Sequence, residues 1–128
     1  MSEGRIRYLT DRKRAVGKGS AHTGTEHHWA MSATGVALAF MVPTWLWIFG
    51  RALGGTRAEV VEAFARPFPA ILTALVLVVA MRHFAKGATT MLQDYARGTS
   101  LKVGIIFVHS LAAVIAATGL FALIKIAL

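Results

Sequence analysis

The 128-residue sequence contains no cysteine and only six Asp and Glu residues, against 14 Lys and Arg. Without cysteine the chain can form no disulfide, thiolate nucleophile, protein-ligated iron–sulfur cluster or cysteine-based zinc site. Charged residues are also missing from two long runs, His27 to Gly50 and Val103 to Ile124. Apolar runs of about 18 residues or more are long enough to cross a bilayer as a helix. The pattern therefore indicates an integral membrane protein and argues against nucleic-acid binding, despite a pI near 10.9.

The apolar runs predict an all-α fold with three membrane-spanning helices, at about residues 29–49, 67–92 and 103–124. Pro43 lies inside the first span and is expected to kink it. Pro67 is a favourable first residue for the second span. Residues 1–26 form a polar, basic tail, so the three-helix anchor domain is expected to cover residues 27–128. The segment TRAEVVEAFARP, between the first two spans, is expected to make a short amphipathic helix at the membrane surface.

The Lys and Arg residues outside the spans are distributed unevenly. Eight lie in the tail and the second loop: Arg5, Arg7, Arg12, Lys13, Arg14, Lys18, Arg97 and Lys102. Four lie in the first loop and near the C-terminus: Arg51, Arg57, Arg66 and Lys125. Because cytoplasmic segments carry the excess of Lys and Arg, this count predicts a cytoplasmic N-terminus and a C-terminus on the other side.

The second span carries ionisable residues, which are costly inside a membrane and usually face protein, water or a cofactor. At 100° per residue, one stripe of this helix holds His83, Gly87, Thr90 and Asp94. A neighbouring stripe holds Arg82, Lys86 and Gln93. His83 is about 18 Å along the helix from Tyr95, so it lies well inside the bilayer.

A membrane-embedded histidine such as His83 can be an axial ligand of haem iron. Gly87, one turn later, leaves space for a flat macrocycle or for a closely packed helix. Arg82 and Lys86 are then placed to pair with haem propionates. The alternative is that His83 only forms an interhelical hydrogen bond and that Gly87 is a packing notch.

Tyr95 and Asp94 end the second span at the cytoplasmic interface. A phenol can donate a hydrogen bond to a quinone carbonyl, and a neighbouring carboxylate can orient it or relay protons. The alternative is that Tyr95 belongs to an interfacial aromatic belt and that Asp94 pairs with Arg97.

Three further histidines lie in or near the spans. His27 and His28 precede the first span and either reach a haem propionate or quinone site, or are simply solvated. His109 in the third span is a rival haem ligand, but it lacks a glycine one turn on and flanking cations. An interhelical hydrogen bond is therefore the favoured role for His109.

The run His83–Gly87–Asp94–Tyr95, H-x3-G-x6-D-Y, resembles the signature of the smaller hydrophobic anchor subunit of succinate dehydrogenase (respiratory complex II). The three spans, the basic tail and the sequence EHHWAMSATG at the start of the first span resemble the same family. The tail is most similar to the alphaproteobacterial members.

The resemblance implies that His83 is an axial ligand of haem b, whose second axial ligand is a histidine of a partner cytochrome b subunit. It also implies that Tyr95 hydrogen-bonds ubiquinone and that Asp94 lies beside that site. Some family members contact the haem propionates with an arginine near the start of the first span, where this chain has Ser32. One of three residues is expected to substitute for that arginine: His28, Arg82 or Lys86.

The resemblance further implies a multi-pass protein of the bacterial inner membrane, surrounded by lipid and assembled with cytochrome b, iron–sulfur and flavoprotein subunits. Such a chain does not oxidise succinate alone, since it has no G-x-G-x-x-G motif and no cysteine for clusters. It would anchor a succinate:ubiquinone oxidoreductase, supplying one haem ligand and part of the quinone site. Two alternatives stay open: a non-redox structural subunit, and the haem-free anchor of a fumarate reductase.

Overall fold

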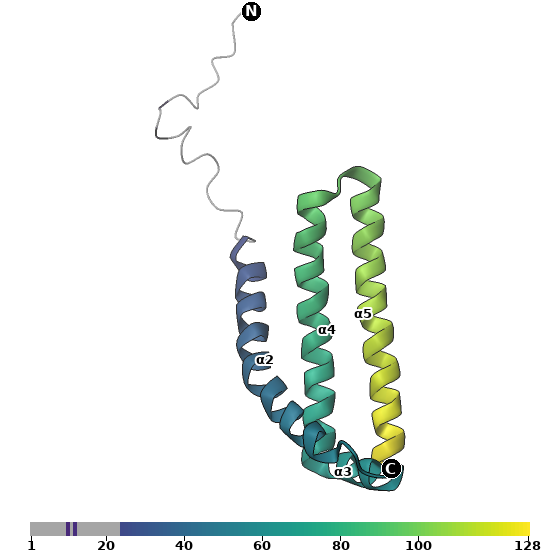
Figure 1. Cartoon of the computed structure of the whole chain (residues 1–128). Helices are drawn as coiled ribbons and strands as arrows, with labels where there is room; N and C mark the ends of the chain where they lie inside the picture. Colours follow the sequence, from purple (N-terminus) through teal and green to yellow (C-terminus); the bar gives the residue numbers. More distant parts are fainter. Residues whose placement is uncertain (1–9, 11, 13–23) are drawn as a thin grey trace, which may run out of the picture.

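The computed structural model describes Thr10, Arg12 and residues 24–128, shown in Figure 1. Its helices are α2 (Gly24–Ala52), α3 (Arg57–Ala65), α4 (Pro67–Tyr95) and α5 (Gly98–Ala127), and these residues contain no strand. Three of the helices, α2, α4 and α5, are long and apolar enough to cross a membrane. The prediction of an all-α protein with three spans is therefore confirmed. The predicted basic tail, residues 1–26, lies mostly outside the described residues.

Each long helix extends beyond the apolar run that predicted it. The helix α4 has 29 residues and runs from Pro67 to Tyr95, as expected, so it extends beyond the membrane span predicted at about residues 67–92. At ~1.5 Å per residue it is about 43 Å long, whereas the hydrocarbon layer is about 30 Å thick. The polar residues at its ends therefore reach the headgroup region without ending the helix.

The helix α2 continues through Pro43, and its ribbon turns toward α4 in its second half (Figure 1). Proline lacks the N–H that would bond the preceding turn, and its ring crowds the carbonyl four residues earlier. A bend within the helix, rather than a break, is the expected result when the flanking residues stay in the membrane.

The short helix predicted in the first loop is present as α3, and a capping box begins it. The Thr56 backbone N–H donates to Glu59 Oε2 at 2.7 Å, and the Glu59 N–H donates to Thr56 Oγ1 at 3.4 Å. The Thr56 hydroxyl also donates to Glu59 Oε2, at 2.9 Å. The two hydrogen bonds that this carboxylate accepts from Thr56, from the backbone N–H first and from the hydroxyl second, lower the pKa of Glu59 below its ordinary value of 4.5. At the other end of α3, Phe64 is buried, with its ring centroid 6.5 Å from those of Trp45 and Phe49. The aromatic contact holds α3 against the end of α2.

The helix α4 occupies the middle of the bundle, with α2 on one side and α5 on the other (Figure 1). Among the described residues, α2 and α5 do not contact each other. A two-residue connection, Ala96–Arg97, joins α4 to α5, and Gly98 at the start of α5 has a positive φ of 61°. Glycine tolerates this left-handed conformation, so the chain can reverse direction within a few residues.

Small residues bring α4 and α5 close together. A Cβ atom placed on Gly119 would lie only 2.5 Å from Leu77 Cδ2, and one on Gly104 would lie 3.2 Å from Leu92 Cδ1. Close approach at glycine is a common way for membrane helices to pack. In lipid the hydrophobic effect does not drive helices together, so their association depends on close van der Waals contact.

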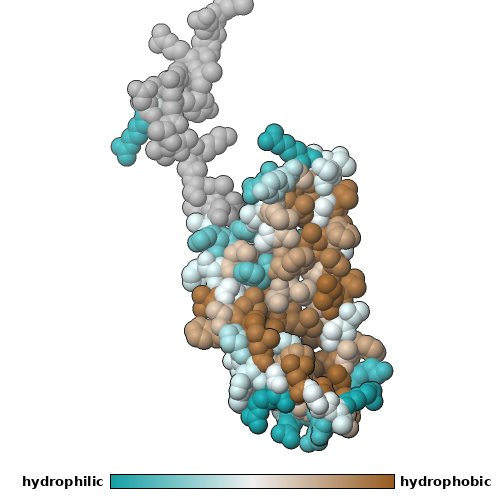
Figure 2. Space-filling view, in the orientation of Figure 1, coloured by the Kyte–Doolittle hydropathy of each residue, from teal (hydrophilic) through white to brown (hydrophobic). Residues whose placement is uncertain are grey.

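The bundle buries little of its apolar surface. In the part of the chain that is described, the buried residues are Phe64, Leu72, Ala85, Ala112 and Leu123. Figure 2 shows an apolar surface between two hydrophilic ends. A surface of this kind is stable against lipid tails or against other membrane helices, which is consistent with a membrane anchor.

Candidate functional site

His83 lies on the face of α4 that packs against α2. Its Nδ1 is 2.9 Å from Thr34 Oγ1, and the imidazole is half-buried. The ring also faces Gly35, because a Cβ atom placed on that glycine would lie 3.6 Å from His83 Cε1. A histidine in the spanning part of α4 is therefore oriented by two consecutive residues of another span.

The stripe predicted from helical periodicity faces α2 over at least two turns. One turn after His83, a Cβ atom placed on Gly87 would lie 3.6 Å from Met31 Cε. About one turn further toward Tyr95, Thr90 Oγ1 is 2.8 Å from His27 Nε2. Gly87 therefore faces α2, and a Cβ atom there would make an ordinary van der Waals contact with Met31. The fourth member of the stripe, Asp94, is exposed.

The contact between α2 and α4 contains two reciprocal His–Thr pairs. His83 contacts Thr34, and His27 contacts Thr90, so each helix contributes one histidine and one threonine. On both helices the threonine follows the histidine by seven residues, about two helical turns. Because the helices are antiparallel, equal spacing places each histidine opposite the other helix's threonine.

Thr34 was not singled out from the sequence as a site residue. Its signal was present, since the spacing H-x6-T occurs once in the first span and once in the second. Equal spacing becomes informative only when the two segments are known to pack against each other in register.

Arg82 and His109 lie on the other side of α4. Both line a cavity of about 220 Å³ between α4 and α5, which is smaller than an ordinary ligand pocket of roughly 300–1,000 Å³. His109 Nε2 is 3.2 Å from Thr89 Oγ1, so the interhelical hydrogen bond expected for His109 is present. The structure thus separates Arg82 from the face of α4 that carries His83.

The three residues expected near the haem propionates, His28, Arg82 and Lys86, form no ion pair within the described part of the chain. The ion pair present there joins Arg66 and Glu62. Arg82 is exposed and Lys86 is half-buried on α4. His28, near the start of α2, is exposed and has no hydrogen-bond partner among the described residues. These side chains are therefore available to groups outside this chain, but the structure does not bring them together.

Tyr95 is the last residue of α4 and is 87% exposed. Neither Tyr95 nor Asp94 has a hydrogen-bond partner among the residues that the structure describes, and Asp94 forms no ion pair with Arg97 there. The Asp94–Arg97 pair, given above as the alternative to a quinone role, is therefore absent among these residues. Both side chains are presented at the same end of the bundle as the start of α2, on which His27 contacts Thr90.

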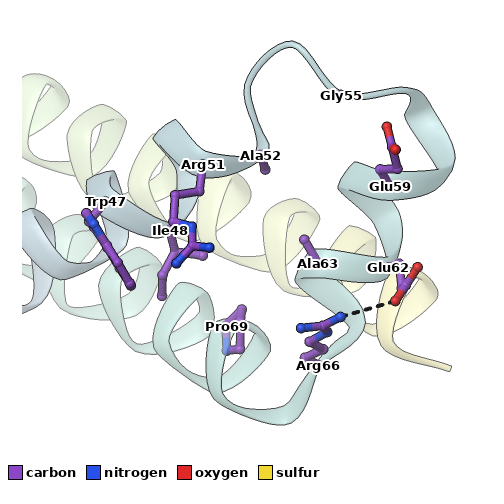
Figure 3. A pocket seen from close by; sticks show the side chains of 10 residues that line it. All are labelled: Trp47, Ile48, Arg51, Ala52, Gly55, Glu59, Glu62, Ala63, Arg66 and Pro69. Atoms are coloured by element: carbon purple, nitrogen blue, oxygen red, sulfur yellow. Dashed lines mark hydrogen bonds and ion pairs between the residues drawn. The ribbon is translucent and has the colours of Figure 1, made fainter.

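A pocket of about 560 Å³ lies at the opposite end of the bundle, around α3 and the end of α2 (Figure 3). Four of the lining residues interact in pairs. Arg51 lies over the Trp47 ring, 5.0 Å from its centroid, and the exposed side chains of Arg66 and Glu62 form an ion pair at 3.2 Å. None of the predicted site residues lines this pocket. Its size does not make it the functional site, because the ionisable residues placed within the membrane lie elsewhere.

The hydrogen bonding of the two His83 ring nitrogens is suited to an axial haem ligand. Thr34 occupies Nδ1, whereas Nε2 has no hydrogen-bond partner among the described residues. The neutral imidazole nitrogen that faces away from the backbone is a strong ligand for iron, and a hydrogen bond on the other nitrogen orients the ring. In His109 and His27, by contrast, it is Nε2 that contacts a threonine.

Comparison with known proteins identifies the family of the chain. The family described as the succinate dehydrogenase/fumarate reductase transmembrane subunit matches residues 7–123. A relative from Paracoccus denitrificans, a succinate dehydrogenase hydrophobic membrane anchor subunit, is 42% identical over 123 residues, covering 96% of this chain and 95% of the relative. No solved structure matches the chain significantly. The chain therefore belongs to the succinate dehydrogenase/fumarate reductase transmembrane-subunit family, as a non-catalytic hydrophobic membrane anchor.

Proposed function

We propose that this anchor subunit supplies one axial ligand of haem b, His83, and part of the ubiquinone site of a succinate:ubiquinone oxidoreductase. The observation that carries the proposal is the environment of His83. It is a half-buried imidazole within a membrane span, held through Nδ1 by Thr34, with Nε2 open. Among the described residues, His27 and His109 contact a threonine through Nε2, whereas His83 does so through Nδ1, so only His83 leaves Nε2, the nitrogen farther from the backbone, open for a ligand.

Haem b, when bound, supplies a one-electron carrier within the membrane. The chain's own contribution is to hold the His83 ring in one orientation and to exclude water from it. Gly35 lies beside the ring, since a Cβ atom placed on it would be 3.6 Å from His83 Cε1, an ordinary van der Waals distance. The second axial ligand comes from the partner cytochrome b subunit, which would pack against the apolar surface of the bundle.

Tyr95 and Asp94 are proposed to act at the quinone. The Tyr95 hydroxyl donates a hydrogen bond to a carbonyl oxygen of ubiquinone, which fixes the ring near the electron donor. Reduction of a quinone to a quinol consumes two protons, and the exposed Asp94 carboxylate is suited to deliver them from the aqueous side. Exposure of both residues in the single chain is expected if the site is completed by other subunits.

The remaining parts of the complex follow from what the chain lacks. With no cysteine it ligates no iron–sulfur cluster, so electrons from succinate must arrive through flavoprotein and iron–sulfur subunits. We place these subunits on the side of Tyr95, which the distribution of Lys and Arg assigns to the cytoplasm. The chain is then a multi-pass protein of the bacterial inner membrane.

One observation favours a competing function. The hydrogen bond between His83 and Thr34 alone would make His83 a link between helices, as in a non-redox subunit or a haem-free fumarate reductase anchor. His109 offers a matched control, because it too is a histidine joined to a threonine across a helix contact.

The test is the dithionite-reduced absorbance spectrum of the purified complex carrying His83→Ala or His109→Ala. Each substitution removes one interhelical His–Thr bond, but only His83→Ala removes the proposed ligand. We expect His83→Ala to abolish or strongly weaken the b-type band and His109→Ala to leave it nearly unchanged. A normal band in assembled His83→Ala complex, or loss of the band in His109→Ala alone, would contradict the proposal.

A further inference from the structure

The hydrogen bonds around Thr34 determine which nitrogen of His83 carries the proton. Thr34 Oγ1 is 2.8 Å from the carbonyl oxygen of Ala30 and 3.1 Å from that of Met31, both on its own helix. A hydroxyl has a single hydrogen, which it donates here to the backbone. The hydroxyl oxygen then remains as an acceptor for His83 Nδ1, 2.9 Å away.

The opposite assignment leaves more groups unsatisfied. If Thr34 donated to Nδ1 instead, the hydrogen of the neutral His83 ring would be on Nε2. No hydrogen-bond acceptor faces Nε2 in the described part of the chain, so this N–H would be unpaired in an apolar layer. The arrangement that satisfies every donor is Nδ1–H donating to Thr34 while Thr34 O–H donates to Ala30.

The other His–Thr pairs show that contact through Nδ1 is not a general property of histidines in the bundle. The hydroxyls of Thr90 and Thr89 also lie close to carbonyl oxygens four residues earlier, at 3.1 and 2.7 Å. Their histidine partners, His27 and His109, are contacted at Nε2, the nitrogen farther from the backbone. In this set of three pairs, only the Thr34 contact leaves Nε2 open.

We propose that Thr34 is a positioning residue for His83: it accepts the Nδ1–H hydrogen bond, selects the tautomer whose Nε2 lone pair is available, and increases the basicity of the ligand. The inference rests on the proposed role of His83 as a haem ligand. A hydrogen bond to the outer nitrogen of a metal-bound histidine makes it a stronger donor, which favours the oxidised metal. Loss of the bond should therefore raise the reduction potential of the haem and weaken its binding.

The experiment compares Thr34→Val, Thr34→Ser and Thr89→Val in the purified complex. Valine is nearly isosteric with threonine but cannot accept a hydrogen bond, whereas serine keeps the hydroxyl. Thr89→Val is the matched control, since it removes the corresponding contact to His109. The measurements are the midpoint potential from a redox titration of the b-type band, and the haem retained per assembled complex.

We expect Thr34→Val to raise the midpoint potential and to weaken haem retention by about 10- to 100-fold, the usual effect of losing such a partner. Thr34→Ser and Thr89→Val should both stay close to wild type. An unchanged potential and haem content in Thr34→Val would overturn the proposal, as would an equal shift in Thr89→Val. If Thr34→Val does not assemble, Thr34→Ala replaces it, and failure of that variant beside an assembled Thr89→Ala would assign Thr34 to packing instead.

These outcomes separate the inference from the proposed function on which it rests. A b-type band that survives His83→Ala removes the haem-ligand role itself. A band lost in His83→Ala, together with a wild-type potential in Thr34→Val, leaves the ligand in place and removes only the role of Thr34.

Discussion

Removal of one oxygen atom from Tyr95 offers a clean test of the quinone site. Tyr95 is 87% exposed and has no hydrogen-bond partner among the described residues, so Tyr95→Phe breaks no contact within the chain. Exposed substitutions of this kind change the stability of a protein by less than about 0.5 kcal/mol. Any large functional effect must therefore come from a group outside the chain.

The expected size follows from the hydrogen bond that Tyr95 would donate to the quinone. Loss of such a bond costs roughly 0.5–1.5 kcal/mol, and more if the quinone oxygen is left unsatisfied. At about 1.4 kcal/mol for each factor of ten, the upper end of this range corresponds to a fall in succinate–quinone turnover of about tenfold in Tyr95→Phe, and an unsatisfied quinone oxygen would increase it. Succinate oxidation with a soluble artificial acceptor should be unchanged, since those electrons need not reach the anchor.

The assay measures both activities in the same membranes, and their ratio corrects for the amount of assembled complex. Trp29→Phe is a suitable control, because Trp29 is 74% exposed near the same end of the bundle. Asp94→Asn should impair quinone reduction as well, since an amide cannot relay protons as a carboxylate does. Normal quinone reduction by fully assembled Tyr95→Phe complex would show that the phenol belongs only to the aromatic belt, and an equal loss in Trp29→Phe would lead to the same conclusion.

Three further predictions concern packing, pH and orientation. Gly119→Leu should destabilise the α4–α5 contact by roughly 1–3 kcal/mol through collision with Leu77, seen as a lower melting temperature, whereas Gly50→Leu, with no neighbour within 4 Å, should not. Because the pKa of Glu59 is lowered, its capping contribution to α3 is fully present above pH 4.5 and is lost as the pH falls through the lowered pKa. Amide-exchange protection in α3 should therefore decrease in that acidic range, and Glu59→Gln should remove this pH dependence. Since the chain has no cysteine, Leu128→Cys should be labelled by an impermeant maleimide from outside intact cells, and labelling only after lysis would reverse the orientation.

Much of the candidate site could be predicted from local sequence because helical periodicity is local. The 100° step placed His83, Gly87 and Thr90 on one stripe, and all three face α2 in the structure. The lack of a glycine one turn on and of flanking cations predicted an interhelical hydrogen bond for His109, but not that Thr89 would be its partner. A partner on another helix depends on the register between helices, which periodicity within one helix does not contain.

The amino-acid sequence alone determined the helical class and the number of spans, because a backbone in hydrocarbon must satisfy its hydrogen bonds within each helix. It also determined which residues share a face of α4. Only the tertiary structure decided that α4 lies between α2 and α5. It also decided that two residues adjacent in sequence face different helices: His83 contacts α2, whereas Arg82 lines the cavity between α4 and α5. It likewise decided that Thr34, 49 residues away, occupies Nδ1 of His83. That contact depends on the register between two antiparallel helices, which is a property of their packing and not of either helix by itself.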